Sequence, residues 1–492
     1  MSIPTVIAAT VILLGSTFMA PTQAANLEAS DINGIWLGNL QVRNESLRIQ
    51  VTVRTDEAGM VYCALESLDQ HAMTMGCENV QRAGADFSFD VPTINGHWHG
   101  TLSDKTLTGT WSQGADLPLT FHKIAAPERP REVVYDEALA AVDAAGMQAV
   151  LDRDLKQSLK DGYLSPQTHA GLTIGVIRHG VRRLFSYGIA KPDSLYEIGS
   201  ITKTFTGLIL SQMILQGKVS LDEPIRKLLP PGTVRRPQGP EIELVDLVTH
   251  QSGLPRLPDN FNPRDDANPY IDYTQSDLYA FMAKRGVGKP KNAAFLYSNL
   301  GFGLLGQGLA NAAGTSYPLL LKVEITEPLG LRDTAIALSE EQRGRFLQGY
   351  AAGQPVHSWE FDALAGCGAI RSSAGDMLTY LEIQLHPDML PAFAQATLNG
   401  KTLKKALVQA QTKRSNLGEG TMAFAWMSNS EFGYRHNGGT AGFTSFAFFN
   451  PKEDYAAVVL LNLAPNTRGS IADRIGVHIN QRFLGKPAIA VE

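Results

Sequence analysis

One segment of the chain, "SITKTFTGLILSQMILQG" at residues 200–217, is apolar on nearly all sides if it forms a helix. A helix without a polar face is normally buried in the middle of its domain. Gly217 ends the apolar pattern and is a suitable C-terminal cap, because glycine readily adopts the left-handed conformation that ends many helices. The sequence therefore predicts a domain built around a central buried helix.

Ser200 and Lys203 stand at the start of this segment, one helical turn apart. They would face the same side of the helix at its N-terminal end, where backbone N–H groups and the helix dipole stabilise negative charge. A serine alkoxide and an acyl oxyanion would both be favoured at that position. The structural alternative is an ordinary helix start, since serine is common there and lysine is common on helices. Ser200 is, however, the only serine with a lysine three residues later.

Two further motifs add chemistry to this pair. Tyr297 and Asn299 form the only Tyr-x-Asn in the chain; the phenol can shuttle a proton, and the amide can bind a substrate amide or orient a lysine. Taken alone, the motif also fits a turn with a buried tyrosine. His436, Gly438 and Gly439 follow a predicted strand in "YRHNGGTAGF". Glycines there would let a substrate lie against the strand edge and let a backbone N–H reach an oxyanion.

The N-terminus is typical of an exported protein. An apolar stretch is followed by "PTQAAN", in which Thr22 and Ala24 fit a small-x-small cleavage site, so we expect residues 1–25 to be a secretory signal peptide. An uncleaved membrane anchor and a buried apolar helix are the alternatives. The expected location is the periplasm or the extracellular medium. Cys63 and Cys77 could pair in such an oxidising compartment, which would leave Cys367 free.

The 492 residues exceed the usual size of one core, and the hydrophobic pattern changes along the chain. Residues 26–123 follow a period of two, as in "LRIQVTVRT", and predict a small antiparallel barrel or sandwich. Residues 124–140 include prolines and mixed charges and are predicted to be a linker. Residues 141–492 have predicted strands near both ends and helices between them, which indicates an α/β domain whose terminal segments share one sheet.

Several classes of function are disfavoured. A net charge of −5 and a pI near 6.1 provide no basic surface for nucleic acid. His97 and His99 would share one face of a strand, but the sequence supplies no evident third ligand, so we expect neither a metal nor another cofactor. The oligomeric state cannot be predicted.

The order of the motifs, Ser-x-x-Lys, then Tyr-x-Asn, then His-x-Gly, resembles that of the penicillin-recognising serine hydrolases. This family includes class C β-lactamases, D-alanyl-D-alanine carboxypeptidases and esterases of the β-lactamase fold. The resemblance extends over residues 155–483 and includes the segments "SLYEIGSITKTFTG", "VTHQSGLP", "YSNLGFGLLGQGLA", "PLGLRDT", "AGCGAIRSSAGDM" and "HNGGTAGF". It implies a helical subdomain beside an α/β subdomain with a five-stranded antiparallel sheet, and a site in the cleft between them. The preceding all-β domain resembles the lipocalin-like accessory modules of some relatives.

The resemblance also implies residue roles. Ser200 would be the nucleophile, Lys203 its proton partner and Tyr297 a second acid/base group. Asn299 would bind the substrate amide, and His436, Gly438 and Gly439 would line the substrate-binding strand. The oxyanion hole would consist of the backbone N–H groups of Ser200 and Gly439.

The implied reaction is hydrolysis of D-alanyl peptide amides or β-lactams through an acyl-enzyme, with a small molecule or a peptidoglycan peptide as substrate. Many β-lactamases have Lys-Thr-Gly where this chain has His436, whose imidazole is expected to be only partly charged near neutral pH. This departure favours D-alanyl peptides over efficient penicillin destruction. A carboxylesterase on the same scaffold, or a penicillin-binding sensor with slow deacylation, remain the alternatives.

Overall fold

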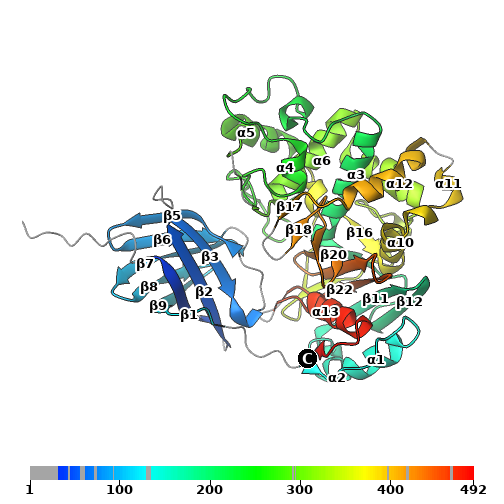
Figure 1. The fold of residues 1–492 in the computed structure, drawn as a ribbon, viewed down its shortest axis with the longest axis horizontal. Helices are drawn as coiled ribbons and strands as arrows, with labels where there is room; N and C mark the ends of the chain where they lie inside the picture. The colour runs from blue at the N-terminus through cyan, green and yellow to red at the C-terminus, as the bar shows by residue number, and fades with distance from the viewer. Residues whose placement is uncertain are drawn as a thin grey trace, which may run out of the picture.

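The computed structural model describes residues 32–42, 45–55, 61–70, 75–91, 94–128, 135–290, 293, 295–395, 398–416, 420–465 and 469–491. The predicted signal peptide lies outside these residues. Within them, no helix is long and apolar enough to cross a membrane. Figure 1 shows the early strands gathered in one all-β body, and the helices and later strands in a second body.

The all-β body is a single antiparallel sheet in the order β4-β3-β2-β1-β9-β8-β7-β6-β5. Strands that follow one another in sequence pair, except β4 and β5, which form the two edges of the sheet. β1 also pairs with β9, so the sheet curves into a barrel-like form. The strands are β1 (Gly34–Val42), β2 (Glu45–Thr55), β3 (Val61–Ser67), β4 (Met75–Gly76), β5 (Glu78–Ala83), β6 (Asp86–Val91), β7 (Gly96–Ser103), β8 (Thr106–Ser112) and β9 (Asp116–Ile124).

Large aromatic side chains fill the interior of this body. Trp98 stacks on Phe89 and meets Phe121 edge-on, with ring centroids 5.6 and 5.5 Å apart, and all three are buried. The alternating apolar residues of β2 point into the same core, as their period of two predicts. The apolar strand faces are therefore a packed core.

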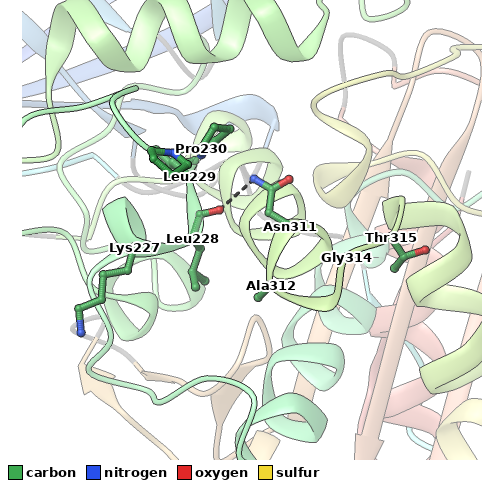
Figure 2. Close-up of a pocket in the computed structure, with 9 residues that line it drawn as sticks. Lys227, Leu228, Leu229, Pro230, Asn311, Ala312, Gly314 and Thr315 are labelled. Carbon is green, nitrogen blue, oxygen red and sulfur yellow. Dashed lines mark hydrogen bonds between the residues drawn. The ribbon is translucent and has the colours of Figure 1, made fainter.

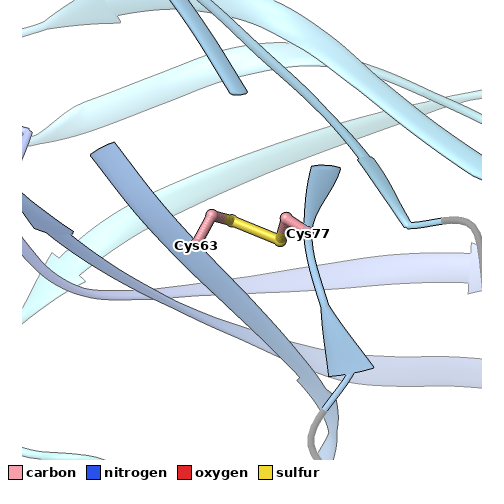
Figure 3. Close-up of a disulfide and its surroundings, with 2 residues drawn as sticks. All are labelled: Cys63 and Cys77. Atoms are coloured by element: carbon pink, nitrogen blue, oxygen red, sulfur yellow. A yellow bond between two sulfur atoms is a disulfide. The ribbon is translucent and has the colours of Figure 1, made fainter. Parts of the chain in front are cut away.

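The disulfide between Cys63 and Cys77 lies in this body and joins β3 to the residue after β4 (Figure 3). The backbone N–H of Cys77 also donates to the carbonyl of Cys63 at 2.9 Å. Cys367 is a free, buried thiol in the other body.

The second body is built on a mixed-length antiparallel sheet in the order β12-β11-β22-β21-β20-β19-β18-β17. Its long strands are β11 (Gly171–Arg178), β12 (Val181–Gly188), β20 (Gly433–Gly439), β21 (Thr444–Asn450) and β22 (Tyr455–Leu461). They form the expected five-stranded sheet, and three short strands extend it: β17 (Ser415–Asn416), β18 (Thr421–Met422) and β19 (Met427–Asn429). Since β11 pairs with β22, the two ends of the domain share one sheet, as predicted.

Helices cover both faces of this sheet (Figure 1). α10 (Ala374–Leu385) packs on one face and α13 (Ile471–Phe483) on the other. All residues of β21 and β22 are consequently buried.

The remaining helices of the second body are α1 (Met147–Asp154), α2 (Lys156–Lys160), α3 (Thr202–Leu215), α4 (Leu244–Val248), α5 (Gln275–Arg285), α6 (Asn299–Ala313), α7 (Tyr317–Leu321), α8 (Glu327–Leu329), α9 (Glu340–Arg343), α11 (Ala392–Gln395) and α12 (Leu398–Ala410). Three two-stranded ribbons complete it: β10 (Tyr135–Asp136) with β23 (Ala488–Ile489), β13 (Leu195–Glu197) with β16 (Arg371–Ser373), and β14 (Gly349–Ala351) with β15 (Gln354–Val356). Residues from Thr202 to Met213 of α3 are all buried, so the central helix is enclosed as its composition predicts.

Candidate active site

Ser200 lies in a short connection between β13 and α3. The connection is a 3-10 turn, Gly199–Ile201, and α3 begins only at Thr202. Ser200 therefore precedes the α-helix by one tight turn, whereas the sequence pattern places it at the helix start. Its side chain is partly exposed, in contrast to the buried residues that follow, so a substrate can reach the hydroxyl.

The buried ammonium of Lys203 connects three elements. Its Nζ donates to Ser200 Oγ at 3.0 Å, to Asn299 Oδ1 at 2.9 Å and to the carbonyl of Cys367 at 2.7 Å. All three acceptors are neutral, so the ammonium is held by hydrogen bonds and has no carboxylate among these contacts. This arrangement keeps one amine within proton-transfer distance of the serine hydroxyl.

Tyr297 and Asn299 come from the start of α6. Ser298 caps this helix, because its Oγ accepts from the N–H of Gly301 at 2.8 Å. Lys203 Nζ lies 4.8 Å from the centroid of the Tyr297 ring, which is a cation–π contact. The cap thus places both the phenol and the amide in contact with the same ammonium.

The strand β20 passes directly behind the Ser200 turn. Gly199 has φ +50°, and a Cβ on it would lie 2.7 Å from the backbone N of Gly439. A Cβ on Gly438 would lie 2.1 Å from the carbonyl of Ile198. Only glycine at both positions lets the two backbones come this close, which brings the backbone N of Gly439 close to the residue that precedes Ser200. The oxyanion hole expected at the N–H groups of Ser200 and Gly439 stays a prediction.

His436 is completely buried on β20, and its Nδ1 lies 2.6 Å from the carbonyl of Asn437. A carbonyl only accepts, so Nδ1 carries the proton and Nε2 offers an unpartnered lone pair. Burial, together with the positive charge of Lys203, lowers the pKa of His436 to about 3. The imidazole is neutral at physiological pH, so the expected partial charge on His436 is wrong.

A second buried imidazole, that of His250, lies against the Tyr297 ring. His250 packs against this ring at 4.4 Å between centroids, and its Nδ1 accepts from the N–H of Ser298 at 3.0 Å. Burial and the charges of Lys203 and Arg256 lower the pKa of His250 well below its usual value. The site therefore combines cations with two neutral imidazoles.

The structure brings together the predicted catalytic residues Ser200, Lys203 and Tyr297 with the predicted substrate-binding residues Asn299, His436, Gly438 and Gly439. Sequence reasoning missed His250, Arg256 and the carbonyl of Cys367. Both side chains lie in or beside "VTHQSGLP", a segment noted only for its resemblance. A carbonyl carries no sequence signal, so the third lysine contact could not have been found.

Glu197 is another missed residue, at the end of β13. Its carboxylate is almost fully buried, Arg371 Nη2 lies 3.6 Å away, and burial raises its pKa. Ser200 follows three positions later, so this buried acid lies in the segment that enters the site.

Two cavities lie away from these residues. The first, of about 460 Å³, is lined by residues 227–231, 311, 312, 314 and 315, where Asn311 Nδ2 donates to the carbonyl of Leu228 at 2.9 Å (Figure 2). The second, of about 650 Å³, lies on the all-β body beside β1, β2 and Pro127. Neither contains a predicted site residue.

Asp136, Asp154 and His478 also lie close together on the second body. Arg482 is fully buried among them, with Nη2 2.8 Å from Asp154 and 3.5 Å from Asp136. The guanidinium is already paired with both carboxylates, so the cluster is a structural ion-pair network that ties the start of the domain to α13.

Comparison with known proteins finds a family match in the second body. Residues 152–479 match the family model described as Beta-lactamase. The D-alanyl-D-alanine-carboxypeptidase/endopeptidase AmpH of Escherichia coli strain K12 is 29% identical over 380 residues, which cover 73% of this chain and 97% of the relative. A beta-lactamase of Pseudomonas fluorescens is 30% identical over 284 residues, covering 56% of this chain and 74% of the relative.

Solved structures agree in fold. A class C beta-lactamase superimposes with a TM-score of 0.57 at 21% identity, covering 71% of this chain and 98% of the other. The class C beta lactamase of Rhodobacter sphaeroides gives 0.53 at 24% identity, covering 66% and 95%.

Proposed function

This chain belongs to the beta-lactamase family and is a serine hydrolase, and on that premise we propose that it cleaves D-alanyl peptide amides or β-lactams through an acyl-enzyme on Ser200. The observation that carries the proposal is the position of the Lys203 ammonium, 3.0 Å from Ser200 Oγ and 2.9 Å from Asn299 Oδ1. The names of the relatives, a carboxypeptidase/endopeptidase and a beta-lactamase, indicate the two substrate classes.

In the proposed reaction, one member of the Lys203–Tyr297 pair is unprotonated, as an amine or a phenolate. It takes the proton of the Ser200 hydroxyl as Oγ attacks the substrate carbonyl, and the pair then returns this proton to the leaving group. The backbone N–H groups of Ser200 and Gly439 bind the oxyanion that forms. The leaving nitrogen takes a proton as the C–N bond breaks, and the acyl group stays on Ser200. Water then attacks the ester, which releases the acid and restores the hydroxyl. Asn299 holds the substrate amide and orients the ammonium.

The decisive experiment is intact-protein mass spectrometry after incubation with penicillin and, separately, with an acyl-D-Ala-D-Ala peptide. We expect a penicilloyl adduct that maps to Ser200, together with release of D-alanine. Ser200→Ala should abolish both, and turnover should fall by about 10³- to 10⁶-fold. Ser276→Ala, an exposed serine on α5, is the matched control and should behave as wild type. An adduct that persists in Ser200→Ala would refute the assignment.

A carboxylesterase is the second candidate, and the neutral His436 favours it. Because the side chain at position 436 is a neutral imidazole and not a lysine, a substrate without a carboxylate loses no ion pair with that side chain. Rapid hydrolysis of short acyl esters, with no turnover of lactam or D-alanyl peptide, would select this function. A penicilloyl adduct that lasts for hours would instead select a penicillin-binding sensor.

We also propose that the protein acts outside the cytoplasm. The apolar N-terminal segment and the Cys63–Cys77 disulfide both support export, because disulfides persist in oxidising compartments. The mass of the mature protein tests this: cleavage after about residue 25 is expected, and an intact N-terminus in the exported fraction would contradict it.

A further inference from the structure

Arg256 is fixed to the same helix start that carries Tyr297 and Asn299. Its carbonyl accepts the backbone N–H groups of Asn299 and Leu300, each at 3.0 Å. The preceding residue, Pro255, is held by Ser298 Oγ, which donates to its carbonyl at 2.6 Å. These bonds make the backbone at Arg256 part of the site and give its side chain a defined origin beside the Tyr297 ring.

The guanidinium of Arg256 contacts this ring as well. Its Cζ lies 5.5 Å from the Tyr297 centroid, and the ammonium of Lys203 lies 4.8 Å from the same centroid. Stacking on a phenol ring restrains a guanidinium without using its N–H donors, which stay available to a ligand. Tyr297 thus places two positive charges at one point of the site.

Arg256 lacks the carboxylate partner that some half-buried arginines of this domain have. Arg226 is paired with Glu241 at 2.9 Å and Arg345 with Asp333 at 2.6 Å. Among the ion pairs of the described residues, none includes Arg256. A partly buried guanidinium without a carboxylate has lost hydration with no compensating charge. A substrate carboxylate would supply that charge in a bidentate pair.

The other residues of the site do not supply a free cation for a substrate carboxylate. His436 on β20 is neutral, and the donors of Lys203 are directed to Ser200, Asn299 and the Cys367 carbonyl. Arg256 is therefore the permanent cation near Tyr297 whose donors are not engaged by the contacts described above.

We propose that Arg256 is a specificity-determining residue, which binds a carboxylate of the substrate on the helical side of Ser200 and so favours substrates that carry a carboxylate. The inference rests on the proposed function, since it assigns the substrate class of that site. It involves binding alone and adds no bond-making step to the reaction.

The test compares charged and neutral members of two substrate pairs. The first pair is acyl-D-Ala-D-Ala and its C-terminal amide; the second is 4-nitrophenyl hemisuccinate and 4-nitrophenyl butyrate, which also serves an esterase. In whichever pair the wild type hydrolyses, we expect Arg256→Gln to lower kcat/KM for the charged substrate by about 10- to 100-fold. The kcat/KM for the neutral substrate should change less than about threefold. Arg256→Lys should keep part of the preference, because it retains charge without the planar fork.

Arg414→Gln is the matched control. Its guanidinium also lies over an aromatic ring, 5.6 Å from the centroid of Phe424, but it contacts no predicted site residue among the contacts described. This variant should leave both substrate pairs unaffected. Equal losses for charged and neutral substrates in Arg256→Gln, or no loss for either, would overturn the proposal.

A binding measurement separates this inference from the proposed function. Calorimetry with Ser200→Ala protein, which cannot acylate, gives the affinity for acyl-D-Ala-D-Ala and for its amide. The charged peptide should bind more tightly, and Arg256→Gln in the same background should remove the difference. If the wild type turns over neither pair, the proposed function fails, and this measurement alone decides the role of Arg256.

Discussion

Gly199→Ala tests whether the close approach of β20 to the Ser200 turn is needed for catalysis. Gly199 has φ +50°, so alanine adds strain of about 1 kcal/mol. Its Cβ would also lie 2.7 Å from the nitrogen and 3.0 Å from the oxygen of Gly439, both backbone atoms that cannot rotate away. To restore an ordinary contact, the two segments must separate by about 0.7 Å.

That displacement moves the N–H of Gly439 away from the position of the oxyanion. Loss of one such donor costs about 10²- to 10³-fold in kcat, because the donor must meet the developing charge at hydrogen-bond distance. We therefore expect Gly199→Ala to lower the rate of acylation by about 10²-fold and the free energy of unfolding by about 1 to 3 kcal/mol. Stopped-flow acylation with a chromogenic β-lactam or ester, and urea unfolding, measure the two effects.

Gly217→Ala separates strain from displacement. Gly217 follows the other end of α3 with φ +70°, and a Cβ there meets no atom within 4 Å. This control variant should lose about 1 kcal/mol in the free energy of unfolding and should keep the activity of the wild type. If Gly199→Ala keeps its acylation rate within about threefold of wild type, the Gly439 donor is not placed as inferred.

Three further predictions concern stability. The pKa of His436 falls to about 3 on folding, so as the pH falls from about 6.5 the unfolded chain binds a proton before the folded protein does, and the free energy of unfolding declines. Urea unfolding of His436→Gln should show a shallower decline with pH. An unchanged pH dependence in this variant would contradict the prediction. Replacing Cys63 and Cys77 by serine opens a link across 14 residues and should cost the all-β body about 3 kcal/mol in thermal unfolding, with kcat unchanged. Asp154→Asn should lower the free energy of unfolding by about 3 kcal/mol at pH 7, because it leaves Arg482 buried without its main partner. This loss should shrink toward pH 2, as Asp154 of the wild type becomes protonated. A loss that does not depend on pH would indicate packing instead.

Much of the fold follows from hydrophobic periodicity. The enclosed helix, the alternating strands of the all-β body and the shared sheet of the second body were all visible in the sequence, because each depends on local pattern. The three short strands β17, β18 and β19 were not, since segments of two or three residues carry no period. Their pairing depends on the edge that β20 offers, which is a tertiary property.

The site was predictable in composition more than in geometry. The spacing of Ser200 and Lys203 indicated a common face, but the 3-10 turn at Ser200 depends on how closely Gly199 meets β20. The charge of His436 could not be predicted, because burial by distant segments sets its pKa. Arg256 could not be singled out from the sequence, because the proposal for it depends on the absence of a carboxylate partner in the folded protein.

The two bodies differ in when their strand partners become available. In the all-β body each pairing except that of β1 with β9 joins neighbours in sequence, so the sheet can grow strand by strand as the chain emerges. In the second body Leu172 on β11 pairs with Leu461 on β22, so an early strand must wait for almost the whole chain. Folding along the direction of synthesis would thus complete the first body while the apolar strand β11 still lacks its partner β22. The unpaired edge of β11 favours misassembly during this interval.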